Sequence, residues 1–433
     1  MIAFLTLYLG LIAGRQPFEL RVDPAVKSVN LYLDGHKVDT ISAPPWRASV
    51  DLGDTIQPHE LVAKGLDGSG AEIARVSQVL NLPRATAELE IVLDRDAKGM
   101  PAHATLSGFH VSYADVRRAT LKLDLIQLKL DRKYRATLPA VDMRRPHVLA
   151  AEMRFADRTV ARREIVFGGE FGESMPAQLT PIVVIARADA GNAPLAPDCF
   201  VSNGQPLRAS NVEKEGAVVI AVRDPDPAET KNAVQYTATT GDPLDTAVLR
   251  SVAAFDENTT MELMSPAADR VVEPGAPTAV LFPSYPNVSS TREGLYWFLV
   301  TTKIRGIALD APRRWADAVA VAAVKAMSSG RRRAVLLVLG SKRDASEHTP
   351  EAVRAYLASV GVPLFVWSVF GPTESGKGWG DVEDVSTLEK MNAASAKIRH
   401  ALDTQRIAWI YADPLTAVRA EVKDGCGYAR LAR

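Results

Sequence analysis

The hydrophobic pattern of the chain changes near Gly172, and this change limits what the chain can fold into. Before it, short stretches alternate apolar and polar side chains, as in SVNLYL at 28–33, and Asp34-Gly35 then forms a strong hairpin signal. After it, unbroken apolar runs such as AVVIAV at 217–222 alternate with segments of helical periodicity. Strands with one buried face show the first pattern, whereas a parallel sheet covered on both faces shows the second. We therefore predict at least two kinds of domain.

Residues 1–83 and 84–175 are each expected to form an Ig-like β-sandwich. In both blocks, short strand-like segments follow one another with Gly or Asp turns between them. Each block has a His-x-Leu step near its end, beginning at His59 and at His147, which indicates tandem copies of one fold. Alternation in the second block slips once, near Leu125, and is otherwise clear at Leu121, Leu123, Ile126 and Leu128.

Residues 176–433 are expected to form one doubly wound α/β domain of the Rossmann type. Thr349 and Pro350 mark the start of a helix that ends before Gly361. A later helical segment carries one apolar stripe of Leu388, Met391, Ile398 and Leu402. The apolar strands between such helices are the pattern on which this prediction depends.

The charge balance argues against nucleic acid as a partner. Fifty-one basic residues balance 51 acidic ones in a chain of 433 residues, so no excess of positive charge would attract phosphates. The apolar start, MIAFLTLYLGLIAG, is too short to span a membrane as a helix. Either it is the apolar part of a signal peptide, or it is a first β-strand that continues into FELRV. No other long apolar segment follows, so no membrane span is expected.

The order of these domains resembles a known arrangement. The stretches VNLYLDGHKV, APPWRASVDLG and HELVAKGLDGSGAEIAR in the first block, with RRAVLLVLGSKRDAS and VRAEVKDGCGYARL later, are similar to the von Willebrand factor A-related proteins of acidobacteria. The resemblance covers most of the chain. It implies two Ig-like sandwiches followed by an A-like α/β domain, with a metal-ion-dependent adhesion site at the carboxyl ends of its strands.

Such an adhesion site has the pattern D-x-S-x-S after the first strand, a Thr from a later loop and an Asp after the fourth strand. Carboxylates and hydroxyls supply most of the roughly six oxygens that Mg²⁺ needs. In VVIAVRDPDPAET, Asp224 matches the first Asp, and Asp226 replaces the first Ser with another oxygen donor. Ala228 replaces the second Ser and has no oxygen to offer.

The remaining positions of the pattern have changed further. Ile307 stands where the Thr is expected, and Gly340 and Ser341 occupy the place of the later Asp. Asp344 follows too late to be an obvious substitute. We therefore predict a degenerate site with no resident cofactor, where at most weak Mg²⁺ binding persists through Asp224 and Asp226.

Two other motifs are expected near the carboxyl ends of the strands, and neither indicates catalysis. GPTESGKG, from Gly371 to Gly378, approaches the P-loop pattern, but Gly378 stands where the Ser or Thr that binds Mg²⁺ belongs. A Gly-rich loop is the simpler interpretation, and Trp379, if exposed, would be a contact residue. His348 lies near acidic and hydroxyl side chains but without a nucleophile elbow, so a polar loop is expected there.

The only two cysteines are Cys199 and Cys426. The ends of an A-type domain are usually neighbours, so the resemblance implies that these two could form a disulfide; two separate buried thiols are the alternative. A disulfide requires an oxidising compartment, which suits a secreted or periplasmic protein.

We therefore expect a non-catalytic, protein-binding or adhesion-type protein that uses the rim of a metal-free A-like domain. The alternatives are a metal- or phosphate-dependent enzyme centred on Asp224 and Asp226, and a purely structural component of the envelope. The partner would be a protein that the sequence does not identify.

Overall fold

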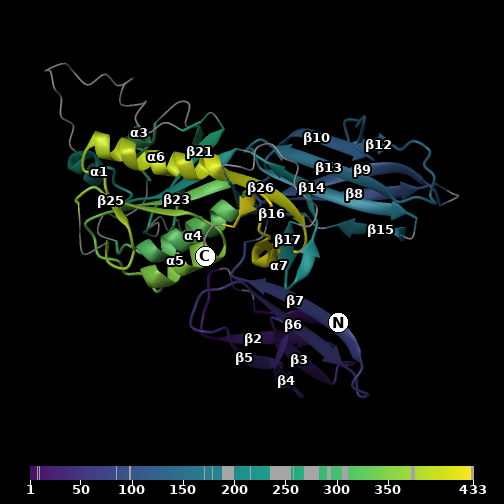
Figure 1. The fold of residues 1–433 in the computed structure, drawn as a ribbon. Helices are drawn as coiled ribbons and strands as arrows, with labels where there is room; N and C mark the ends of the chain where they lie inside the picture. Colours follow the sequence, from purple (N-terminus) through teal and green to yellow (C-terminus); the bar gives the residue numbers. More distant parts are fainter. Residues whose placement is uncertain are drawn as a thin grey trace, which may run out of the picture.

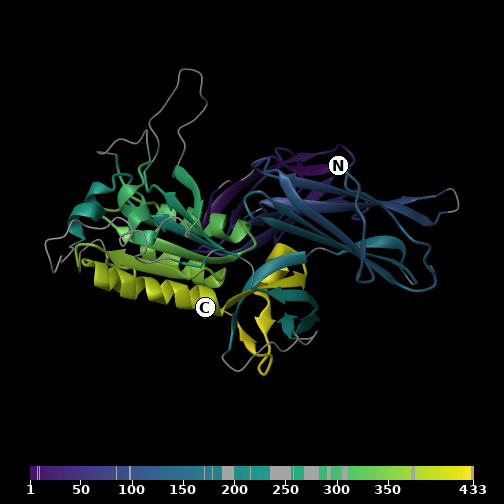
Figure 2. The same cartoon turned by 90° about the horizontal axis from the view of Figure 1, so that it is seen from above.

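A computed structural model shows four packed units (Figures 1 and 2). The structure describes residues 1–433 except 7, 9, 84, 97–98, 170, 178, 188–198, 215, 235–254, 257, 268–281, 290–293, 305–310, 372–375 and 431–433. No helix in this described part is long and apolar enough to cross a membrane.

The first unit is a β-sandwich that encloses its own core. Phe18, Val29 and Leu61 are among its buried core residues. The apolar start of the chain supplies the first strand, β1, which pairs antiparallel with β2. One sheet contains β1 (Ile2–Phe4), β2 (Arg15–Val22) and β5 (Arg47–Asp51). The other contains β4 (His36–Ile41), β3 (Ser28–Leu33), β6 (His59–Leu66) and β7 (Glu72–Leu80).

The second unit is a sandwich of the same general kind, as predicted. Leu89, Leu121 and Leu149 belong to the buried core between its two sheets. One sheet contains β12 (Arg135–Thr137), β9 (Pro101–His110) and β8 (Ala87–Arg95). The other contains β11 (Ile126–Leu128), β10 (Val116–Leu123), β13 (His147–Phe155), β14 (Val160–Gly168) and β15 (Phe171–Ala177).

An aspartate–histidine pair recurs at one turn of each sandwich. Asp34 accepts hydrogen bonds from Glu60 N at 2.9 Å, and its other oxygen lies 2.7 Å from His59 Nδ1. Asp124 accepts from Val148 N at 2.9 Å, and its other oxygen lies 2.6 Å from His147 Nδ1.

The backbone hydrogen bonds of the two turns also correspond. The amide N–H of each aspartate donates to the carbonyl of the residue after the histidine, and both N···O distances are 2.9 Å. Two turns with the same four partners support the interpretation of the sandwiches as tandem copies.

The third unit is a mixed six-stranded sheet with helices on both faces. Strands β21, β20, β23, β24 and β25 run parallel to their neighbours, and β22 runs antiparallel at one edge. In order across the sheet the strands are β22 (Ser284–Ser289), β21 (Thr259–Met264), β20 (Ala217–Val222), β23 (Arg332–Leu339), β24 (Leu364–Ser368) and β25 (Val382–Asp384).

Alternate residues of the central strands face different helices. Val218, Ile220 and Val222 pack with α4 (Trp315–Ser328) and α5 (Pro350–Ser359). Val219 and Ala221 pack on the other side with α3 (Leu295–Thr301) and α6 (Leu388–Thr404). A short helix, α1 (Ala228–Ala233), follows β20.

The fourth unit is antiparallel and is built from both ends of the region after residue 178. β26 lies between β16 and β19 and pairs antiparallel with each of them. One of its sheets contains β19 (Ala209–Glu213), β26 (Gln405–Tyr411), β16 (Leu179–Ala186) and β28 (Tyr428–Ala429). The other contains β18 (Gln205–Leu207), β17 (Phe200–Ser202) and β27 (Glu421–Val422), and α7 (Pro414–Arg419) lies beside them.

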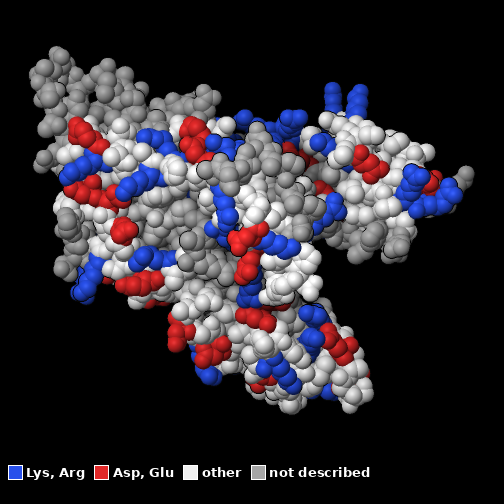
Figure 3. Space-filling view, viewed as in Figure 1, with Lys and Arg blue, Asp and Glu red and all other residues white. Residues whose placement is uncertain are grey.

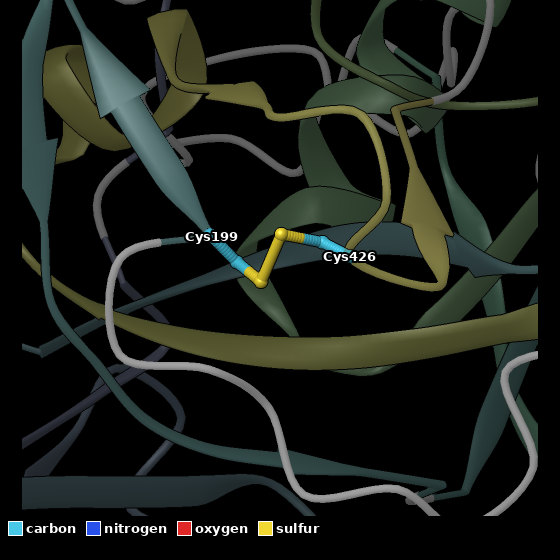
Figure 4. Close-up of a disulfide and its surroundings, with 2 residues drawn as sticks. All are labelled: Cys199 and Cys426. Carbon is cyan, nitrogen blue, oxygen red and sulfur yellow. A yellow bond between two sulfur atoms is a disulfide. The ribbon is translucent and has the colours of Figure 1, made fainter.

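A disulfide joins the two segments that build this unit. Cys199 lies immediately before β17, and Cys426 lies in the turn before β28 (Figure 4). The bond connects residues 227 positions apart in the sequence. Cys199 is 1% exposed and packs in the small core of the unit with Phe200 and Ile410.

The predicted fold class is therefore wrong. Residues 176–433 do not form one doubly wound, Rossmann-type domain, because the fourth unit separates both ends of this region from the mixed sheet. Strand accounts for 45% and helix for 17% of the structure. The error comes from β26, whose apolar run suggested a parallel strand covered by helices. Instead, Ile407 and Trp409 face Val160 of the second sandwich, and Ala408 and Ile410 face the core around Cys199.

Polar contacts and one shared core join the units. Ile56 of the first sandwich belongs to the buried cluster under α4 and α5, and Tyr356 Oη donates to Asn81 O at 3.0 Å. Arg419 of α7 lies 3.0 Å from Asp34 and donates to the Pro58 carbonyl, also at 3.0 Å.

The second sandwich is joined in the same way. Its Arg162 lies 2.8 Å from Glu213 and stacks over Trp409 at 4.8 Å. Thr86 Oγ1 donates to Ser328 Oγ at 2.8 Å. The sandwiches are therefore fixed against the rest of the chain by side chains at four junctions.

Candidate functional site

The carboxyl edge of the mixed sheet is where the sequence places the candidate site, and its central carboxylate is bound by an arginine. Asp224 follows β20, and its side chain is 6% exposed. Arg313, whose side chain is fully buried, donates from Nε to Asp224 Oδ2 at 2.6 Å and from Nη2 to Oδ1 at 3.3 Å. Both oxygens that would bind a cation are thus occupied by a guanidinium in bidentate geometry.

A second buried arginine holds the backbone at this point. Arg223 Nη1 donates to the Asp224 carbonyl, and Nη2 donates to Thr302 O at 2.5 Å. Thr302 is the C-cap of α3, so the cation lies at the negative end of that helix. Burial lowers the pKa of Arg223 to about 10. The guanidinium stays charged at neutral pH and ties the end of β20 to the end of α3.

Asp226 has a local backbone role. Its Oδ1 accepts from Ala228 N at 3.0 Å, just before α1. Asp224 Oδ1 in turn accepts from Asp226 N at 3.0 Å. Ala228 takes part here through its backbone N–H. Ile307, expected in the place of the Thr, lies outside the described residues.

Glu229 was not part of the sequence motif. Its side chain lies beside Gly340 and Ser341, the two residues that follow β23. It accepts hydrogen bonds from Ser341 N at 3.3 Å and from Ser341 Oγ. A Cβ at Gly340 would lie 2.7 Å from Glu229 Oε2, so a larger residue at this position would displace the carboxylate. An acidic residue in the first turn of the helix after β20 was the signal in the sequence for this contact.

Asp344 caps a helix from a distance. Its carboxylate accepts from Trp315 N at 2.9 Å and from Ala316 N at 3.3 Å, the first two residues of α4. Asp317 of the same helix accepts from Glu347 N at 3.0 Å and from His348 N at 3.2 Å. Asp344 thereby satisfies free N–H groups at the start of α4, and Asp317 binds the loop that precedes α5, so both carboxylates have structural partners.

Trp379 is not a contact residue. It is 2% exposed and packs in the core under α4 and α5 with Tyr356 and Leu357. Of the Gly-rich loop before it, residues 372–375 lie outside the described residues. The carbonyl of Gly378 accepts from Arg354 Nη1 at 3.3 Å, which ties this end of the loop to α5.

These residues do not fit the metal ion that the resemblance implies. Arg313 already neutralises Asp224, and a second cation beside it would be repelled. Ala228 provides no oxygen ligand, and Ser341 donates its hydroxyl to Glu229. Among the described residues there is no group of three or more His, Cys, Asp or Glu side chains that could hold a metal ion.

An open cleft of about 840 Å³ lies beside this cluster. Phe370 at its wall is 44% exposed, so part of its ring is accessible from the cleft. The cleft is lined by Ala228, Glu229, Asn232, Ser341, Val369, Phe370, Gly371, Asp384 and Ser386. On the far wall, hydrogen bonds from Lys390 and Ser386 lower the pKa of Asp384 to about 2. The cleft therefore combines acceptor groups with one apolar surface.

Comparison with known proteins does not place the chain in a family. No family model and no curated protein matches it. Among solved structures, it is similar to fibronectin(III)-like modules of Clostridium thermocellum CbhA, with 12% identity over 39% of this chain and 93% of the other, at a TM-score of 0.16. It is also similar to a central fibronectin-III array of RIM-binding protein, with 11% identity over 48% of this chain and 78% of the other, at 0.20.

A third similar structure is the SGBP-B protein of a Bacteroides ovatus mixed-linkage glucan utilization locus, in complex with a mixed-linkage heptasaccharide. Its identity is 11% over 48% of this chain and 58% of the other, at a TM-score of 0.15. Likenesses at such low TM-scores do not show a family, and the resemblance to von Willebrand factor A-related proteins stays a prediction.

Proposed function

We propose that the protein is a non-catalytic binding protein whose partner enters the cleft beside Glu229 and Phe370. The observation that carries this proposal is the buried ion pair in which Arg313 binds both carboxylate oxygens of Asp224. An internal cation takes the position at which a metal would otherwise contact a partner's carboxylate. Recognition then rests on the neighbouring cleft, where hydroxyl, amide and carboxylate groups surround an exposed aromatic ring. Few polar groups around an apolar surface are typical of a recognition site.

The same observation argues against an enzyme centred on Asp224 and Asp226. A general base must reach the proton it removes, but Asp224 is buried beneath Arg313 and Asp226 accepts from the backbone at the start of α1. Ser341 contacts Glu229, and the described contacts give this pair no third group that orients the carboxylate as a base.

The disulfide between Cys199 and Cys426 supports an oxidising compartment, because such bonds are rare where thiols are kept reduced. We infer that the protein is secreted or periplasmic. Free thiols at both positions in protein isolated from its source would contradict this placement.

The metal-free state can be tested by titrating the full chain with Mg²⁺ or Mn²⁺ while following thermal unfolding. We expect no rise in Tm. Asp224→Ala should lower the free energy of unfolding by about 3–5 kcal/mol, because it leaves Arg313 buried without its partner. Asp226→Ala is the control, and its loss of one hydrogen bond should cost about 1 kcal/mol. A metal-dependent rise in Tm that Asp224→Ala abolishes would overturn the proposal.

The cleft can be tested by capture from the envelope fraction of the source cell, with crosslinking. Phe370→Ala and Ser341→Ala should both lose the captured partner. Phe370→Ala should keep the wild-type Tm, and Ser341→Ala, which loses one exposed hydrogen bond to Glu229, should lower Tm only slightly. Tyr113→Ala, an 87% exposed aromatic on the second sandwich, should keep it. If both cleft variants captured the partner as the wild type does, a purely structural role would be favoured. The side-chain contacts that join the units are compatible with such a role.

A further inference from the structure

The turn between β10 and β11 presents two large apolar side chains to solvent. Leu125 is 90% exposed and Ile126 is 71% exposed. We call these two residues the apolar tip. They lie at the end of the second sandwich that is remote from Thr86, which contacts Ser328 at the junction with α4, and this end projects away from the other units (Figures 1 and 2).

The backbone of this turn is unfavourable for leucine. Asp124 and Leu125 have φ of 48° and 74°, both in the left-handed region. The matching turn of the first sandwich has Asp34 and Gly35 at 51° and 83°. Glycine adopts such φ values without steric cost, whereas a branched side chain does not. The fold does not require Leu125, since the first copy builds the same turn with glycine.

Basic side chains lie near the apolar tip. Residues 122–145 contain seven basic and three acidic side chains, in a chain whose net charge is zero. His147 contacts Asp124, and its other ring nitrogen lies 3.0 Å from the carbonyl of Asp142. This contact places the turn that holds Arg144 and Arg145 beside the tip. The side chain of Arg144 is 91% exposed and lies 3.0 Å from Asp142. Figure 3 shows a group of Lys and Arg side chains, with an acidic one beside them, at the free end of this sandwich.

We propose that this end of the second sandwich docks on an anionic lipid surface. Leu125 and Ile126 would enter the interfacial region, and Arg144, Arg145 and Lys122 would contact the phosphates. Lipid can close around a convex tip, whereas a protein partner would need a preformed pocket to cover both side chains. Basic residues beside an apolar anchor strengthen binding to anionic membranes. The site is separate from the cleft at Glu229, so its test does not depend on the function proposed for that cleft.

The test is co-sedimentation of the full chain with vesicles of phosphatidylcholine alone or mixed with phosphatidylglycerol. We expect binding to the mixed vesicles that weakens at high salt, because screening reduces attraction to phosphates. Leu125→Gly combined with Ile126→Ser should weaken binding roughly tenfold or more, because both apolar anchors are lost. Tm should not fall, since glycine suits the turn. Arg144→Gln with Arg145→Gln should also weaken binding.

Ile73→Ser, at a 47% exposed position on the first sandwich, is the control and should bind vesicles as the wild type does. Absence of wild-type binding to the anionic vesicles would overturn the proposal, as would equal binding by the tip variant. Self-association of the wild type that Leu125→Gly abolishes, without vesicle binding, would assign the tip to a contact between copies and also overturn it.

Discussion

The two sandwiches contain the same aspartate–histidine turn, yet they use it differently. In the first, Asp34 also lies 3.0 Å from Arg419, so the turn becomes part of a junction with α7. In the second, the side chain of Asp124 is 44% exposed, and Leu125 beside it points to solvent. The comparison shows that the hydrogen bonds that form a turn can be kept in both copies while its outer surface changes its role. Three kinds of change test whether the two turns differ in this way.

Removing the aspartate should have the largest effect, and it should differ between copies. Asp34→Ala should lower the free energy of unfolding by about 2–3 kcal/mol, because His59, Glu60 N and Arg419 all lose a charged partner. Asp124→Ala should cost about 1–2 kcal/mol, because its two partners are closer to solvent. Urea unfolding, compared at constant m-value, measures both.

A double-mutant cycle identifies the source of the difference. In an Arg419→Ala background, Asp34→Ala should cost about as much as Asp124→Ala does in the wild type. Equal losses for the two aspartates in the wild-type chain would mean that Arg419 adds nothing to the first turn.

Exchanging the next residue should have a smaller effect of opposite sign in each copy. Gly35→Leu should destabilise the chain by about 1–2 kcal/mol, and Leu125→Gly should stabilise it by about 1 kcal/mol, because only glycine tolerates the positive φ. An added Cβ at Gly35 meets no atom within 4 Å, so the effect comes from the backbone alone.

Gly68→Leu is the matched control, since its Cβ would also meet open space and its φ is not in the left-handed region. It should change stability much less than Gly35→Leu. Comparable losses at both glycines would show that the backbone of the turn is not the cause.

The pH dependence of stability should act at opposite ends of the pH scale in the two turns. Burial alone would raise the pKa of Asp34, but hydrogen bonds from His59 and Glu60 N, with Arg419, lower it to about 2. Its contribution is present above about pH 3.8, its ordinary value, and is lost as pH falls towards about 2. The hydrogen bond to Asp124 raises the pKa of His147 above 6.5. That contribution is complete below pH 6.5 and is lost as pH rises through the folded pKa.

Urea midpoints measured across pH would separate the two. Asp34→Asn should flatten the acid limb, and His147→Gln should flatten the limb above neutral pH. If either variant changed both limbs, the two turns would not titrate independently.

Local patterns predicted much of the fold. Alternating side chains identified both sandwiches, and Thr349 does cap its helix, accepting from Ala352 N at 3.2 Å. The direction of β26 could not be predicted, because an apolar run shows that a strand is buried on both faces but not what covers them. Here a second sandwich covers one face, and that contact is set by tertiary structure.

The candidate site was harder to predict for a similar reason. The motif located Asp224, but its partner Arg313 is 89 residues away in the sequence, and no local pattern connects the two. Trp379 was expected at the rim because it follows a Gly-rich loop, yet its side chain turns into the core. Sequence spacing identifies which groups end near one edge of a sheet. Whether the side chains of these groups face solvent or the core depends on tertiary packing, which cannot be predicted from sequence spacing.

The position of β26 affects how the protein can be made. This strand lies between β16 and β19, but its synthesis begins 192 residues after the end of β19 (405 − 213) and 219 residues after the end of β16 (405 − 186). Until residues 405–411 leave the ribosome or the export channel, the two earlier strands have open edges that can pair with other chains. The whole mixed sheet is completed in that interval. A chain truncated before Gln405 should therefore contain a finished mixed sheet beside two unprotected strands, and it would be a substrate for chaperones and proteases.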